Sequence, residues 1–209
     1  MIMDNFPFDT TGLCSEDMYR LNETYKALSA KFHIELTGQI NFHLNQFEVF
    51  KNYLDINLRD SYVIKHPNKD SYILFIETHM RNVSAKATVI TDYFEYHTWA
   101  LAYLKHDFGR VLIRRETLTD KLIELIHPVE LDFEEDKAFS DTFYVLVNER
   151  DKAASAIDRN FRNAVMDIRH DNFVIEIVEH TLIIGSQEPI SPERAVYLAE
   201  FVSRVASMC

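Results

Sequence analysis

Apolar residues recur along the chain with two periods, about 3.6 residues where a helix is expected and 2 where a strand is expected. Met18, Leu21, Tyr25 and Leu28 recur at spacings of three and four, so they predict an amphipathic helix. Ser15 precedes two acidic residues and is the predicted N-cap of this helix. We therefore expect the fold to open with a helix.

Alternating apolar positions follow this helix and are typical of β-strands. The first run has Phe32, Ile34 and Leu36, and the second has Ile40, Phe42 and Leu44. A Thr37-Gly38 pair between the two runs is a common turn sequence. The pattern predicts a β-hairpin between residues 32 and 44.

Three runs rich in β-branched and aromatic residues follow at residues 72–77, 87–94 and 99–104. Polar segments separate them, so we expect antiparallel strands. Val111 and Ile113 continue this sheet. The apolar residues between 118 and 126 predict a short helix that ends before Pro128.

The last third of the chain has the clearest periodicity. It predicts a strand at 143–147, a helix at 153–168, strands at 173–177 and 182–184 around a Glu179-His180 turn, and a closing helix from 192 to 205. Ser191 is the predicted cap of that last helix, with Pro192 at its first position. Because adjacent late strands need only a hairpin, the class is α+β, with mainly antiparallel sheet covered by helices.

The acidic loop at 130–137 suggests a subdivision of one compact unit spanning residues 1–209. The first part, residues 1–130, holds a helix and most strands, and the second, residues 131–209, is a β-α-β-β-α unit. The sequence leaves open whether the two parts share one sheet.

Composition excludes several classes of partner. The 33 acidic residues exceed the 22 Lys and Arg, and the formal charge of -11 repels nucleic acid and gives no polybasic membrane patch. No apolar run reaches the ~18 residues of a transmembrane segment, and residues 1–9 carry acids where a signal peptide has positive charge, so we expect neither. Two cysteines suit a reducing compartment, so we expect a cytoplasmic protein.

The centre of the chain contains, in order, Ile113-Arg114-Arg115-Glu116, Lys121, Leu131-Asp132-Phe133 and Phe139-Ser140. This order resembles a bacterial domain family without an assigned activity. That family shows Leu-Arg-Pro-Glu, a lysine-containing helix, Asp-Ile-Asp-Phe and Phe-Ser, followed by a strand and a helix. Arg115 replaces the family's proline, which makes this chain a distant member. The resemblance implies a fold and no reaction, substrate or cofactor.

Acidic residues and nine histidines raise the possibility of a metal site. No helical His-Glu-x-x-His or Cys/His cluster is present, so the signal is weak. The strongest local group is Asp92, Glu95 and His97, if a strand bend brings Asp92 and His97 together. The alternative is ordinary polarity at a strand end.

The resemblance region contains a second group of charged residues, Arg114, Glu116, Lys121 and Asp132. We interpret these residues as a structural polar network, because no nucleophile motif accompanies them. The neighbouring acidic run at 132–136 could supply paired carboxylates for acid–base chemistry, but consecutive loop acids are usually solvated.

Aromatic residues gather in the predicted strands between 93 and 103. Tyr93, Tyr96, Trp99 and Tyr103 are candidate binding residues, because aromatic rings give a large contact area with a polar edge. The alternative is that they form sheet core.

These features predict a non-enzymatic protein-binding or scaffold module with a protein partner or self-association, and without a cofactor. One alternative is a metal-dependent hydrolase or small-ligand-binding protein that uses Asp92, Glu95 and His97. A second is a self-associating assembly subunit.

Overall fold

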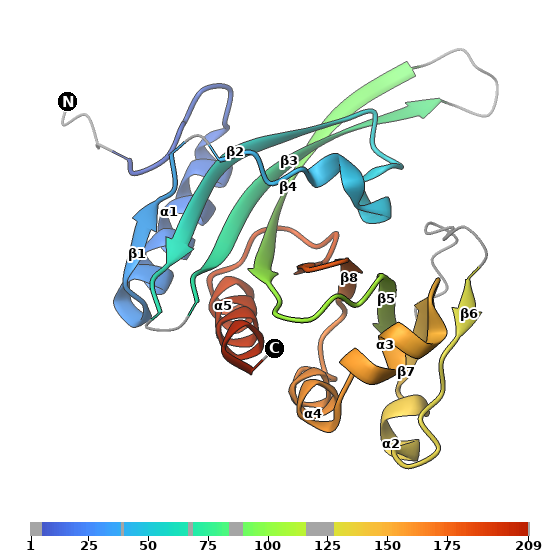
Figure 1. Cartoon of the computed structure of the whole chain (residues 1–209). Coiled ribbons are helices and arrows are strands. Elements are labelled where there is room, and N and C mark those ends of the chain that lie inside the picture. Colours follow the sequence, from blue (N-terminus) through green and yellow to red (C-terminus); the bar gives the residue numbers. More distant parts are fainter. Residues whose placement is uncertain (1–5, 39, 67–68, 84–89, 116–127, 209) are drawn as a thin grey trace.

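A computed structural model describes residues 6–38, 40–66, 69–83, 90–115 and 128–208 (Figure 1). Within these residues nine strands form one sheet, in the order β1-β2-β3-β4-β9-β8-β5-β7-β6, and each neighbouring pair is antiparallel. The strands are β1 (Ile34–Leu36), β2 (Asp55–Ile64), β3 (Ser71–Val83), β4 (Ile90–Tyr103), β5 (Arg110–Arg115), β6 (Val129–Glu130), β7 (Phe143–Val147), β8 (Val174–Val178) and β9 (Thr181–Gly185). The helices are α1 (Ser15–Lys31), α2 (Lys137–Ser140), α3 (Arg150–Ala156), α4 (Arg159–Asp167) and α5 (Pro192–Met208), with 3₁₀ turns η1 (Leu44–Gln46) and η2 (Glu48–Phe50). The predicted α+β class is confirmed.

The sheet joins both halves of the sequence. β4 pairs with β9, and β5 lies between β8 and β7. Strands before residue 130 therefore alternate in the sheet with strands after it, so the two predicted parts share one sheet.

Helices cover one face of the sheet. α5 packs against α1, α4 and the strands β3 and β4, as Figure 1 shows. Its predicted apolar stripe is buried: Ala195, Leu198, Phe201, Val202 and Val205. Each large side chain of this kind contributes about 1.5–3 kcal/mol when it leaves water, so this face holds the main core.

The segment at 42–50 covers part of the opposite face of the sheet. Phe42, Phe47 and Phe50 are buried there, and Phe50 meets the Trp99 ring edge-on at a centroid distance of 4.9 Å. Trp99 lies opposite Gly185 in the β4–β9 register, and a Cβ on Gly185 would overlap the indole. Glycine at this position therefore makes room for the tryptophan.

A buried carboxylate fixes this segment to the sheet. Glu176 of β8 is fully buried and accepts the backbone N–H groups of Glu48 and Val49 at 2.9 and 3.0 Å. Burial raises the pKa of Glu176, although the two backbone bonds oppose that shift. The Nη1 of Arg110 lies 3.8 Å from a Glu176 oxygen, and the guanidinium also contacts the Gln46 carbonyl oxygen at 3.3 Å.

The predicted hairpin at 32–44 is wrong. β1 pairs with the far end of β2, where Ile34 lies opposite Ile64, and residues 40–43 form no strand. Residues 40–44, the second half of the predicted hairpin, lie across the face of the sheet. Phe42 and Phe47 are buried there, and this burial outweighs the preference of an alternating sequence for a strand. Cys14, not Ser15, occupies the N-cap position of α1.

Other boundaries also differ from the predictions. The predicted helix at 153–168 is two helices, because the Asp158 carboxylate accepts the Phe161 N–H at 2.8 Å and begins α4. Residues 90–94 and 99–103 of two predicted runs belong to one strand, β4, and residues 87–89 lie outside the described residues. The β8–β9 turn is confirmed, with Glu179 at a φ of 55°. The predicted helix at 118–126 lies outside the described residues.

Candidate functional site

β4 is much longer than β9, the strand that pairs with one of its two edges. It pairs with β3 along all 13 residues of that strand, whereas β9 reaches only the stretch from Trp99 to Tyr103. Figure 1 shows β3 and β4 projecting beyond the neighbouring strands. Over the described residues, the edge of β4 from Ile90 to Thr98 has no strand beside it. Such an edge is a template for a further strand.

A cavity of about 200 Å³ opens beside this edge. α1 contributes Asp17 and Arg20, β4 contributes residues 94–97, and the segment after β9 contributes Gln187, Pro189 and Ile190. Phe94 stands at the cavity with 55% of its surface exposed and stacks on His79 at a centroid distance of 4.7 Å. The site therefore combines an open strand edge, an exposed ring and a small pocket.

His97 fixes the wall of this cavity. Its side chain is buried, and Nδ1 lies 3.2 Å from the Glu188 carbonyl oxygen. A carbonyl only accepts, so Nδ1 carries the proton, and Nε2 accepts the Thr78 hydroxyl at 3.2 Å. Burial lowers the pKa of His97, in keeping with a neutral ring. His97 thereby ties β3 and β4 to the segment that contains Glu188.

Tyr96 points to the opposite face of β4 from His97, because successive side chains of a strand alternate. The Arg59 guanidinium lies 5.9 Å from its ring centroid and pairs with the Glu77 carboxylate, with Nε to Oε2 at 2.9 Å. Burial, together with Glu77, raises the pKa of Tyr96 to about 12, so its hydroxyl keeps its proton. The Tyr96 side chain at the cavity is therefore uncharged.

Two carboxylates at the cavity lack a cationic partner in the part of the chain that the structure describes. Asp17 accepts only the Cys14 thiol, at 3.0 Å, and Glu95 lies 3.5 Å from the neutral His97 ring. Arg20 faces the cavity but is bonded to Glu16. The local charge at the cavity is negative.

The structure does not bring the proposed metal ligands together. Asp92 lies on the opposite face of β4 from Glu95 and His97, and its carboxylate binds Arg81 at 2.7 and 3.1 Å. β4 pairs with β3 from Ile90 to Ala102 without a register shift, so its side chains keep alternating between the two faces. Among the described residues, no group of three His, Cys, Asp or Glu side chains is placed to hold a metal ion.

The four candidate aromatic residues also separate. Trp99 is buried in the core beneath the 42–50 segment, and Tyr103 is 37% exposed and meets the Tyr72 ring at 5.9 Å. Tyr93 is partly exposed near the start of the strand, about 34 Å from Tyr103 at the usual strand rise. Of the four, Tyr96 lines the cavity.

The proposed polar network is only partly visible. Glu116 and Lys121 lie outside the described residues, Asp132 is exposed, and the Arg114 guanidinium lies 5.1 Å from the Tyr144 ring centroid. No ion pair of Arg114 occurs within the described ranges.

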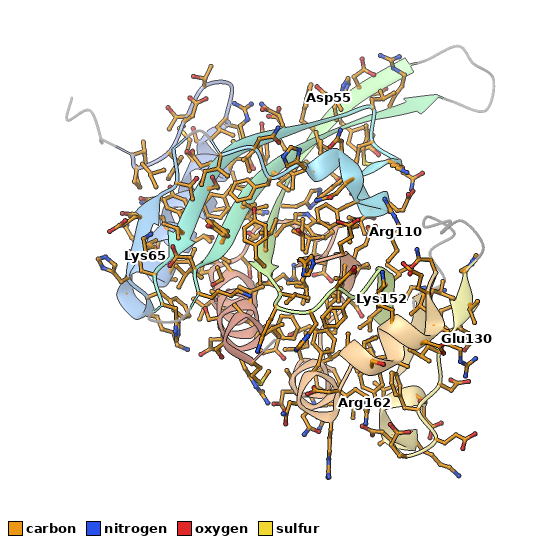
Figure 2. The ribbon with its side chains drawn as sticks, viewed as in Figure 1. Asp55, Lys65, Arg110, Glu130, Lys152 and Arg162 are labelled. Atoms are coloured by element: carbon orange, nitrogen blue, oxygen red, sulfur yellow. The ribbon has the colours of Figure 1, made fainter. Side chains whose placement is uncertain are left out.

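A different arginine organises the acidic loop. Arg162 of α4 is buried and binds Asp136 at 2.9 Å, Glu135 at 3.1 Å and the Ile157 carbonyl oxygen at 3.0 Å. It also lies 4.5 Å from the Phe133 ring centroid, and Figure 2 labels it on α4. Two acids of the 132–136 run are therefore structural. The signal in the sequence was an arginine between the apolar positions of a helix.

No family model matches the chain, and no curated protein sequence matches it. A solved structure does: the mycobacterial trehalose monomycolate transport factor A, TtfA, with a TM-score of 0.53 and 13% sequence identity. The match covers 90% of this chain and 92% of that one. At this identity it shows a shared fold alone. The resemblance to the bacterial domain family stays a prediction.

Within the described ranges, no helix is both long enough and apolar enough to cross a bilayer.

Proposed function

We propose that this chain is a non-enzymatic binding module that docks a segment of a partner protein on the free edge of β4. The observation that carries the proposal is Phe94, a large apolar ring that is 55% exposed beside an unpaired strand edge and a cavity. An extended segment can add to such an edge through main-chain hydrogen bonds, while a neighbouring pocket selects one of its side chains. A cytoplasmic location is part of the proposal and rests on the composition of the chain.

The size of the cavity favours a side chain over a small-molecule ligand. Sites that enclose drug-sized ligands have about 300–1,000 Å³, more than the cavity of about 200 Å³ here. The structural neighbour is named as a transport factor for trehalose monomycolate. If this chain works in a comparable transport system, the small cavity favours binding of a protein of that system over binding of the transported molecule.

The proposal is tested by site-specific crosslinking in the native cell. A photoreactive phenylalanine at position 94 should crosslink one defined partner protein, identified by mass spectrometry. The same group at Met208, which is 38% exposed at the end of α5, is the control and should not capture that partner. Equal capture from both positions, or crosslinks only to a second copy of this chain, would contradict the proposal.

A further inference from the structure

We infer that the segment docked on β4 is basic, and that one of its lysine or arginine side chains enters the cavity between Asp17 and Glu95. The inference rests on the proposed function and names the chemistry of its partner. It follows from the charges and rings that line the cavity, together with the open strand edge.

The charges around the cavity are unbalanced. Each described arginine near the site already has a carboxylate: Arg20 pairs with Glu16, Arg59 with Glu77, Arg81 with Asp92 and Arg194 with Glu188. Asp17 and Glu95 have no such cation within the described residues, and Glu95 is 44% exposed. A cationic side chain would supply the missing partner for two carboxylates at once.

The aromatic residues favour the same kind of side chain. Phe94 and Tyr96 both line the cavity, and an ammonium or guanidinium group within about 6 Å of a ring centroid is attracted to the ring face. The long apolar stem of lysine or arginine can also cover the exposed Phe94 ring. An acidic or a purely apolar side chain would satisfy only part of this lining.

The whole-chain charge argues against a second copy as the occupant. The formal charge is -11, so two copies repel each other, whereas a basic segment is attracted.

Because alternate residues of an added strand face the same side, one basic residue enters the cavity and the residue two positions away projects on the same face of that strand.

Two fluorescein-labelled peptides of twelve residues test the inference. One alternates lysine with valine and threonine, and the other carries glutamate in place of each lysine. Fluorescence anisotropy with the full-length chain should show the lysine peptide binding at least ten times more tightly. The Asp17→Asn/Glu95→Gln double variant should weaken that binding at least tenfold.

The matched control is Glu134→Gln/Asp151→Asn, which changes the net charge equally at exposed positions before α2 and on α3. This control should bind the lysine peptide within about twofold of the unmodified chain. Equal loss in both double variants would mean that only the overall charge matters, and would overturn the inference. So would equal binding of the two peptides, or no binding of either.

The two proposals can fail separately. If position 94 still crosslinks a single partner while the lysine peptide does not bind, the inference of a basic segment is wrong, and the proposal that a partner docks on the edge of β4 is retained. If position 94 and position 208 give the same crosslinks, the docking edge itself is wrong.

Discussion

The contacts of His97 in the fold give this side chain a structural role. In the sequence it was a candidate metal ligand, but in the structure both ring nitrogens are committed to Glu188 and Thr78. Burial is the largest influence on the ring and lowers its pKa below the usual value of about 6.5. The folded state therefore holds a neutral ring at a pH where the unfolded chain binds a proton.

The resulting pH dependence has a definite sign. The stability contributed by neutral His97 is fully present above pH ~6.5 and is lost as the pH falls toward the lowered pKa of the folded state. We expect the free energy of unfolding to fall by up to about 1.4 kcal/mol per pH unit below that point. Urea unfolding at several pH values measures this slope, and His97→Asn, which keeps a donor for Glu188 but cannot titrate, should flatten it.

The control for this prediction is His180→Asn, at an exposed position in the β8–β9 turn. This variant makes the same chemical change away from the contacts of His97 with Thr78 and Glu188, so it should keep the slope. Identical slopes in the unmodified chain and His97→Asn would show that another group is responsible.

At the scale of elements, the attachment of the 42–50 segment depends on Glu176. Figure 2 shows Arg110 close to this segment, and the Glu176 carboxylate accepts two of its backbone N–H groups. The amide of Glu176→Gln has one acceptor oxygen, so one N–H would face another donor in a buried site. We expect a loss of about 1–3 kcal/mol in the free energy of unfolding, and faster hydrogen exchange at Glu48 and Val49.

Glu179→Gln is the matched control, because it makes the same chemical change at an exposed position of the same hairpin. It should leave both the unfolding free energy and the exchange at 48–49 unchanged. If Glu176→Gln also left the exchange at 48–49 unchanged, the carboxylate would not be what holds the segment.

Elements were predictable from the sequence where the local pattern and the tertiary environment agree. β7 and α5 follow their periodicity because each buries one face against the main core, whereas β8 and β9 are short apolar runs buried on both faces of the sheet. The predicted hairpin at 32–44 failed because Phe42 and Phe47 are buried across the sheet, a contact between distant parts of the chain. The cavity was even less predictable from the sequence. Asp17 lies in α1, Glu95 in β4 and Pro189 in the segment after β9, so no local sequence pattern links them.

At the scale of the whole molecule, the order of the strands makes the two sequence halves dependent on each other. β4 needs β9 on one side, and β5 lies between β8 and β7, so a cut after residue 130 would separate all of these pairs. Glu176 and Trp99 add to this dependence, because each anchors a contact between the halves. Removing either half would also expose the apolar faces that the other half covers.

We therefore expect that neither residues 1–130 nor residues 131–209 fold alone, although an acidic loop marks that boundary in the sequence. Each fragment should show the narrow amide proton dispersion of an unfolded chain in NMR spectra. In the intact chain, urea unfolding followed by Trp99 fluorescence and by far-ultraviolet circular dichroism should give one coincident transition, since Trp99 lies where β4 meets β9. Native-like dispersion in either fragment, or two separated transitions, would show that the shared sheet does not couple the halves.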